Sequence, residues 1–264
     1  MNTPPDVRVL ARGAMFELGQ PSRFGHVRIT LPLPGHAVEP IRFLHLSDLH
    51  LIRPWSFGLD ELNRIVGELS PQLILFTGDW IHGRIEHGAT RDNLLRICRH
   101  WVGTCPVFAV RGNHDKHLPM ALMRDLGVQM IEGESRQISI GKRTIELVGL
   151  VGRSRRRVTP RFLSRFPSRT DTQQTARIVL THFPDTIEKI GSLAPDLVLA
   201  GHTHGGQICL PGAIPLIRHD SLPRRFCHGL NQHANGYIHV TSGLGCSGIW
   251  VRAFRPAEIA EFVV

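Results

Sequence analysis

Five short apolar runs, rich in Val, Ile and Leu, recur along the chain, and each is followed closely by polar residues. The runs are residues 43–46, 73–76, 107–110, 178–180 and 197–200. Continuous apolar runs of this length are typical of strands that are covered on both faces, because a strand with one wet face would alternate. The pattern therefore predicts an α/β protein. Open α/β sheets bind ligands beyond the carboxyl ends of their strands, so we expect the polar clusters to meet there.

The polar clusters combine carboxylates, an amide and histidines. They are Asp48 and His50 in Ser-Asp-Leu-His, Asp79 in Thr-Gly-Asp-Trp, Asn113 and His114 in Arg-Gly-Asn-His-Asp, His182 in Leu-Thr-His-Phe, and His202 and His204 in Gly-His-Thr-His. Imidazole, carboxylate and amide oxygen suit Mn, Fe or Zn, and the absence of Cys from the clusters argues against a structural zinc site. A carboxylate can bridge two ions about 3.5 to 4 Å apart. The clusters therefore predict a two-metal hydrolase with Asp79 as the bridge.

The alternative for each of these residues is an ordinary role in a turn or a helix cap, which Asp, Asn and His often fill. That alternative explains any one of them, but it requires neither this order nor this histidine content. Gly78, Gly112 and Gly201 precede ligand candidates, and glycine lets the backbone turn sharply beneath a metal. His45 lies inside the first run and is interpreted as a core histidine.

In order, the motifs D-x-H, G-D, G-N-H-D, an isolated H and G-H-x-H resemble those of the calcineurin-like metallophosphoesterases, from Asp48 to His204. The resemblance implies a four-layer α/β/β/α sandwich, with two central mixed β-sheets flanked by helices. It also implies hydrolysis of a phosphodiester or pyrophosphate by in-line attack of a metal-bridging hydroxide. Two divalent ions are expected, with Mn favoured over Fe and Zn.

The same resemblance implies a role for each matching residue. The first metal would be held by Asp48, His50, Asp79 and His204, and the second by Asp79, Asn113, His182 and His202. His114 would stabilise the transition state or protonate the leaving oxygen, and Asp115 would orient His114. Many members carry a second acid after the G-D motif, where this chain continues as Trp-Ile-His-Gly-Arg. His82 or Arg84 is therefore a candidate for substrate contact.

Residues 201–208 and 242–248 resemble a small bacterial branch of the family that includes UDP-2,3-diacylglucosamine pyrophosphatase-like enzymes of lipid A synthesis. That nucleotide lipid is the specific substrate that we expect. Gln207 is a candidate substrate contact because its amide offers a donor and an acceptor. A plain turn explains residues 205–207 equally well, and residues 242–248 also fit an ordinary loop.

The length of 264 residues and the 42% hydrophobic content are compatible with one domain over residues 1–264, in which residues 1–40 form an edge or cover segment. The chain has no basic start followed by an apolar stretch and no run of 18 apolar residues. Its five cysteines are odd in number and lack C-x-x-C pairing, which favours reduced thiols. We expect a cytoplasmic protein, peripheral on the inner face of the membrane.

Positive charge is in excess, with 31 Lys and Arg against 22 Asp and Glu and a formal charge of +9. Such a balance favours anionic partners. Much of it lies in residues 153–169, a basic insertion or cap whose candidate substrate contacts are Arg153, Arg155, Arg156 and Arg157. Val158, Phe162 and Phe166 recur there at helical spacing, which predicts a short amphipathic element on an anionic lipid surface. A solvated loop is the alternative.

Three other functions compete with the lipid-linked nucleotide. A nuclease would use the same arginines along a phosphate backbone, and its binding would weaken steeply with salt. A cyclic or small-nucleotide phosphodiesterase would need neither the arginines nor the phenylalanines. A protein-binding scaffold of the same fold would have lost metal ligands, whereas every ligand position is filled here. The sequence favours an anionic phosphate ester, with nucleic acid less favoured and no obligate protein partner.

Overall fold

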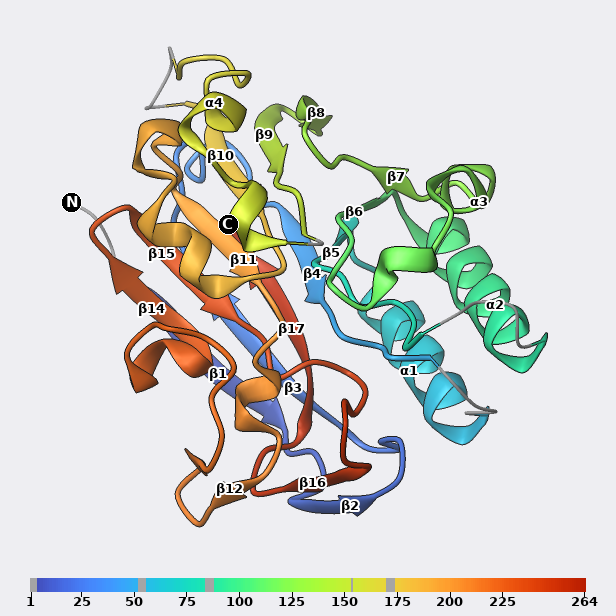
Figure 1. Cartoon of the computed structure of the whole chain (residues 1–264). Coiled ribbons are helices and arrows are strands. Elements are labelled where there is room, and N and C mark those ends of the chain that lie inside the picture. Colours follow the sequence, from blue (N-terminus) through green and yellow to red (C-terminus); the bar gives the residue numbers. More distant parts are fainter. Residues whose placement is uncertain (1–3, 52–55, 84–87, 153, 170–173) are drawn as a thin grey trace.

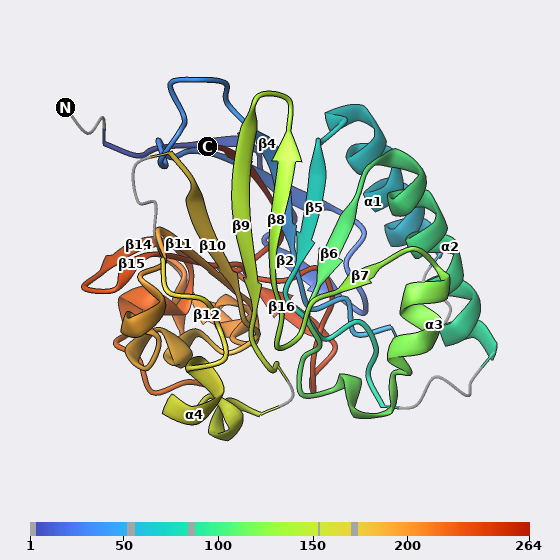
Figure 2. The same ribbon diagram turned by 90° about the horizontal axis from the view of Figure 1, so that it is seen from above.

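Two β-sheets lie face to face, with helices outside them (Figure 2). The computed structural model describes residues 4–51, 56–83, 88–152, 154–169 and 174–264. The first sheet has seven strands in the order β1 (Asp6–Ala11), β3 (Phe24–Thr30), β17 (Ala257–Val263), β4 (Arg42–Leu46), β5 (Leu73–Phe76), β6 (Val107–Ala109) and β7 (Gln129–Met130). The second has six in the order β14 (Gly229–His233), β15 (Gly236–Val240), β11 (Leu197–Ala200), β10 (Ala176–Leu180), β9 (Arg143–Gly149) and β8 (Ser135–Ile140).

Both sheets are mixed. The run from β4 to β7 is parallel, as is the run from β9 through β10 and β11 to β15, while β8 and β14 pair antiparallel at the edges of the second sheet. The five apolar runs form β4, β5, β6, β10 and β11, which confirms those strand predictions. The N-terminal residues add β3 beside β17 and place β1 at the sheet edge.

Three hydrophobic layers hold the sheets and helices together. Phe43 and Leu75 face inward and meet Ile178 and other side chains of the second sheet. On the outer face of the first sheet, Leu44 and its neighbours pack against α1 (Ser56–Leu69) and α2 (Gly88–Thr104), with α3 (Met120–Asp125) beside them. Helix α2 buries Leu94, Ile97, Cys98 and Trp101, the three- and four-residue spacing of one helix face.

The fourth layer covers the second sheet with short pieces rather than long helices. These are α4 (Pro160–Leu163) and the 3-10 turns η2 (Arg155–Arg157), η3 (Pro184–Glu188), η4 (Gly191–Leu193) and η6 (Arg224–Cys227). The predicted four-layer α/β/β/α sandwich is thus the observed architecture, with a thin outer layer on one side (Figure 1).

The apolar residues of the basic segment point inward. Val158 and Phe166 are buried against the second sheet, with Phe162 packed beside them. The idea that this face lies on a lipid surface is therefore wrong, because core packing already covers it. Arg155, Arg156 and Arg157 form the exposed turn η2, and Arg153 lies outside the described residues.

The five cysteines are all free and buried. Among the helices that the structure describes, none is long and apolar enough to cross a bilayer.

Two small ribbons complete the fold at one end: β12 (Cys209–Leu210) with β13 (Ile214–Pro215), and β2 (Phe16–Leu18) with β16 (Val251–Ala253).

Candidate metal centre

All the predicted ligand side chains lie just beyond the carboxyl ends of β4, β5, β6, β10 and β11. The backbone is forced into the left-handed region at many of these positions, with positive φ at Asp48 (56°), His50 (46°), Asp79 (58°), His202 (71°) and His204 (51°). Non-glycine residues rarely adopt this region, and such conformations persist only where the surrounding structure imposes them. The strain here serves to turn several donor atoms into one small volume.

The first donor set surrounds the imidazole of His50. Its Nε2 atom lies 3.0 Å from His204 Nε2, 3.4 Å from Asp79 Oδ2 and 3.8 Å from Asp48 Oδ1. His204 Nε2 is in turn 3.4 Å from Asp48 Oδ1. Four donor atoms on four side chains therefore converge at the distances that one shared cation would require.

The second donor set surrounds the imidazole of His182. His182 Nε2 is 3.2 Å from Asp79 Oδ2 and 3.0 Å from Asn113 Oδ1, while His182 Nδ1 donates to the Thr77 carbonyl oxygen at 2.9 Å. The ring of His202 lies 5.0 Å from that of His182, and the backbone carbonyl oxygen of His219 fixes His202 Nε2 at 3.2 Å. Asp79 Oδ2 is thus common to both sets.

The electrostatics of the site fit bound cations. Asp48 and Asp79 are 0% and 1% exposed, and burial would raise the pKa of both carboxyls, yet the neighbouring histidines hold both pKa values well below the usual range. Burial opposes a charged imidazole at His182, but Asp79 raises its pKa to about 9. Buried carboxylates need compensating positive charge, and these nitrogen and oxygen donors suit two divalent ions of the Mn, Fe or Zn type.

Glycine is required where the backbone passes close to the carboxylates. A Cβ on Gly201 would collide with the Ser47 hydroxyl and the Asp48 carboxylate, and one on Gly112 would collide with Asp79. These contacts explain sterically why Gly112 and Gly201 are glycines in the motifs.

His114 lies at the mouth of the site. Its backbone N–H donates to Asp79 Oδ1 at 2.8 Å, and its ring stacks on that of His82 with centroids 4.5 Å apart. Burial lowers the pKa of His114 to about 4, although Asp79 acts in the opposite direction. His82 Nδ1 is also 3.2 Å from His50 Nδ1, which places His82 beside the ligands. Arg84 lies outside the described residues.

Asp115 does not orient the imidazole of His114, so that expectation is wrong. Its Oδ2 accepts from the backbone N–H groups of Asp79 and Gly112, both at 2.8 Å, and its Oδ1 accepts from Ile81 N–H at 3.1 Å. Asp115 therefore ties together the two loops that carry Asp79 and Asn113. Burial, with repulsion from Asp79, raises the pKa of Asp115 to about 7.

Sequence reasoning missed Arg252, which is fully buried on β16. It donates to the carbonyl oxygens of Ser242 at 2.8 Å and Gly245, and its Nη2 lies 3.3 Å from His204 Nδ1. An isolated Arg in a short strand carries no signal of this contact. His45 is a buried core histidine as expected, with its Nδ1 2.8 Å from His239 Nδ1.

A pocket of about 450 Å³ lies over these donors, and both ligand candidates and apolar side chains line it. The ligand candidates in its lining are Asp79, Asn113, His202 and His204. Gln207 lines it, but its amide donates to the Ser247 and Ile249 carbonyl oxygens at 3.1 and 2.6 Å and accepts from Ser247 N–H. Gln207 therefore holds the neighbouring loop. Arg155 pairs with Asp185 at 2.5 Å, outside the pocket lining.

Comparisons with known proteins show what this chain is similar to. The family model of the calcineurin-like phosphoesterases matches residues 41–206. Phosphodiesterase YaeI of Escherichia coli is 29% identical over 244 residues, covering 86% of this chain and 83% of that protein. The uncharacterized metallophosphoesterase YkoQ of Bacillus subtilis is 27% identical over 235 residues, covering 84% and 83%. Among solved structures, the NAD nucleotidase of Haemophilus influenzae covers 82% of this chain and 51% of its own, with 12% identity and a TM-score of 0.47.

Proposed function

The chain belongs to the calcineurin-like phosphoesterases, a family of dinuclear metal-dependent hydrolases, and we propose that it cleaves a phosphodiester or pyrophosphate bond at the centre around Asp79. The observation that supports this most directly is the position of Asp79 Oδ2, which lies 3.4 Å from His50 Nε2 and 3.2 Å from His182 Nε2. One carboxylate oxygen is thereby common to two donor sets. Mn is the ion that we favour.

Two divalent ions bound there would supply Lewis acidity and lower the pKa of a water molecule. The chain itself provides the positioning. Asp48, His50 and His204 would hold one ion, while Asn113, His182 and His202 would hold the other, with Asp79 shared. Asp115 fixes the backbone of both loops, so the carboxylate and the amide keep their separation when a substrate enters.

His114 is the group we assign to the leaving oxygen. Because burial lowers its pKa to about 4, its imidazole is neutral at pH 7 and carries one N–H that can donate to developing negative charge. The ring lies against His82 and His50, at centroid distances of 4.5 and 4.8 Å, so its orientation is restricted before substrate arrives. A phosphate placed beside it would raise its pKa and favour proton transfer.

The substrate that we propose is a phosphate ester with an apolar portion, and UDP-2,3-diacylglucosamine in lipid A synthesis is the specific candidate. The apolar wall of the pocket, formed by Ile208, Leu216, Ile217 and Ile249, supports an apolar portion. We place the reaction at the cytoplasmic face of the membrane. The exposed turn η2 offers Arg156 and Arg157 as further contacts for an anionic headgroup.

The decisive experiment compares kcat/KM of the Mn-reconstituted protein for UDP-2,3-diacylglucosamine in detergent, bis-p-nitrophenyl phosphate and single-stranded DNA. We expect the nucleotide lipid to be preferred, and replacement of Arg156 and Arg157 by Gln to impair its turnover more than that of the small diester. His114→Ala is the control for activity from a contaminant. Turnover of the small diester alone would support the chemistry and exclude the lipid A role, whereas preference for DNA would identify a nuclease.

A further inference from the structure

Exposed apolar side chains gather at one end of the molecule. Thirteen large hydrophobic residues are exposed in the part of the chain that the structure describes, and nine of them belong to three segments near the metal pocket. The nine are Met15, Phe16, Leu18, Leu210, Ile214, Leu216, Ile217, Ile249 and Phe254. A cluster of this kind on a protein surface usually marks an interaction site.

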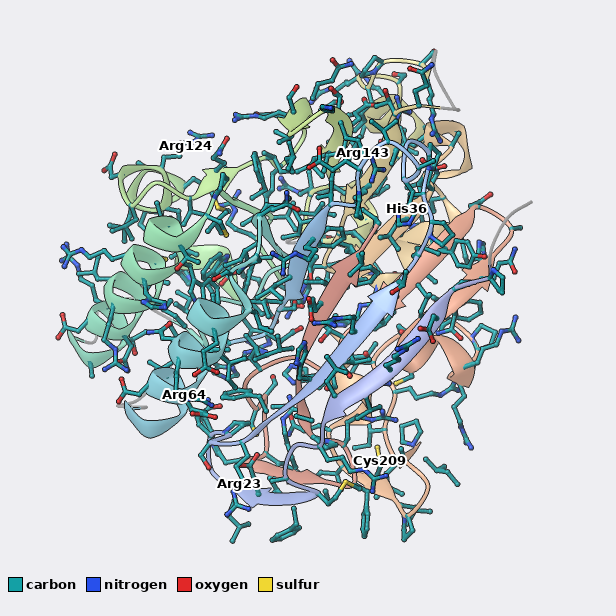
Figure 3. All side chains as sticks on the ribbon, turned by 180° about the vertical axis from the view of Figure 1, so that it is seen from behind. Arg23, His36, Arg64, Arg124, Arg143 and Cys209 are labelled. Carbon is teal, nitrogen blue, oxygen red and sulfur yellow. The ribbon has the colours of Figure 1, made fainter. Side chains whose placement is uncertain are left out.

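Backbone pairing joins the three segments into one surface, which we call the apolar platform: residues 15–18, 208–217 and 249–254. Strand β2 pairs with β16, so that Leu18 lies opposite Val251. Ala253 on β16 bridges to Ile208, whose carbonyl oxygen accepts from Leu216 N–H at 3.2 Å. In Figure 1, β12 lies at the lower end of the molecule together with the paired strands β2 and β16. Cys209, on β12, lies at the same end in Figure 3.

Alternation along the strands keeps the apolar side chains on the outside of the platform. On β12, Cys209 is 3% exposed and its neighbour Leu210 is 49% exposed. On β16, Arg252 is fully buried and donates to loop carbonyl oxygens, which leaves Val251 and Ala253 half-buried on the other side. The outward face is thus fixed by inward hydrogen bonds and is part of the folded structure.

The platform borders the metal pocket on one side. Ile208, Leu216, Ile217 and Ile249 belong to the platform and also line the pocket, together with Asp79. An apolar phase in contact with the platform would therefore lie next to the donor atoms.

The charges beside the platform are mainly positive. Arg12, Arg23 and Arg218 are exposed within or next to its segments, whereas the carboxylates there, Glu17 and Asp220, are partly buried. Glu17 also accepts hydrogen bonds from nearby N–H and hydroxyl groups. Apolar side chains with a basic margin are what an anionic lipid interface attracts.

We propose that the apolar platform docks this protein on an anionic lipid bilayer, with the pocket mouth facing the headgroup layer. The proposed membrane contact is therefore the platform and not the basic segment, because Phe162 and Phe166 of that segment pack in the core. Binding of the platform to a bilayer does not require that the protein hydrolyse a substrate. The further idea that this binding brings a lipid-linked substrate to the metal centre rests on the proposed function.

The test measures co-sedimentation of the full chain with vesicles of equal parts phosphatidylcholine and phosphatidylglycerol, and with pure phosphatidylcholine vesicles. The platform variant is Leu18→Ser with Leu210→Ser, two exposed positions that do not line the pocket. The matched control is Val38→Ser, which is 62% exposed and lies outside the platform. We expect the platform variant to lose roughly tenfold or more in partitioning onto the anionic vesicles, and the control to bind like wild type.

Turnover of bis-p-nitrophenyl phosphate in solution, with unchanged thermal unfolding, verifies that the platform variant is folded. Equal vesicle binding by both variants, or no binding by the wild type, would overturn the proposal. Self-association of the wild type that the variant abolishes, without vesicle binding, would assign the platform to a protein contact instead. Vesicle binding by a protein that hydrolyses no phosphate ester would refute the proposed function and leave the docking intact.

Discussion

A buried pair of histidines between the two sheets should make the protein sensitive to mild acid. His45 Nδ1 lies 2.8 Å from His239 Nδ1, and both residues are at most 1% exposed. His45 Nε2 is also 2.9 Å from Thr77 Oγ1. Protonating two buried imidazoles in contact would bury positive charge and place like charges side by side, which is unfavourable. We therefore expect the free energy of unfolding to fall as pH drops below neutrality.

The magnitude follows from the pKa of His239. Burial lowers this pKa from 6.5 to about 4, although Glu258 opposes the shift. Between these values the unfolded chain binds more protons than the folded chain, so stability rises with pH and is lost as pH falls from 6.5 towards 4. At about 1.4 kcal/mol per pKa unit, the loss from His239 is about 3 kcal/mol. Burial lowers the pKa of His45 as well, which acts in the same direction.

Urea unfolding of the wild type and His239→Gln, each with a chelator, should be compared at a series of pH values from about pH 8 to about pH 4. We expect the variant to lose clearly less stability over this range. Glu258 cannot cause the same loss of stability in this pH range. Burial would raise the pKa of Glu258, but His228 outweighs burial and lowers this pKa from 4.5 to about 2. The stability that Glu258 contributes is therefore lost only below pH 4.5. His100→Gln, on the exposed face of α2, is the control. Parallel curves for wild type and His239→Gln would refute the reasoning.

Replacing Asp79 with Asn should abolish turnover and lower the occupancy of both metals, since its Oδ2 belongs to both donor sets, whereas His114→Ala should slow turnover by about 10²- to 10⁴-fold with both metals retained. Metal analysis beside kcat checks this division, and equal metal loss in the two variants would contradict it. Gly201→Ala should weaken metal binding because its Cβ would collide with Asp48. Titration of Mn checks this, with Gly103→Ala in α2, which meets nothing within 4 Å, as the control.

Many of the strands of this protein can be predicted from local sequence patterns. The apolar runs, including residues 73–76 and 197–200, coincide with β5 and β11, because a strand buried on both faces leaves a local signature of continuous Val, Ile and Leu. The residues that follow them reach the same edge of the sheets because parallel strands end together. The order of the motifs therefore sufficed to predict which side chains the fold gathers around Asp79.

The partners of several site residues depended on contacts far apart in the sequence. Asp115 holds the backbone of Asp79, 36 residues away, whereas the sequence motif predicts that it orients His114. Gln207 holds a loop 40 residues away, whereas the sequence suggests a substrate contact. Arg252 contacts His204 from β16, a strand that pairs with β2 near the N-terminus. Periodicity cannot predict such pairs, because side-chain hydrogen bonds follow the packing of sheets and loops.

The distribution of apolar residues shows the same division. In sequence, Phe166 and Leu18 are equivalent apolar residues, yet Phe166 is 8% exposed and Leu18 is 73% exposed. The strands, the donor types and their order can be predicted from the amino-acid sequence, since they depend on local pattern and residue chemistry. Which apolar side chains remain exposed follows from the fold, because burial depends on the residues that the rest of the chain packs against each side chain.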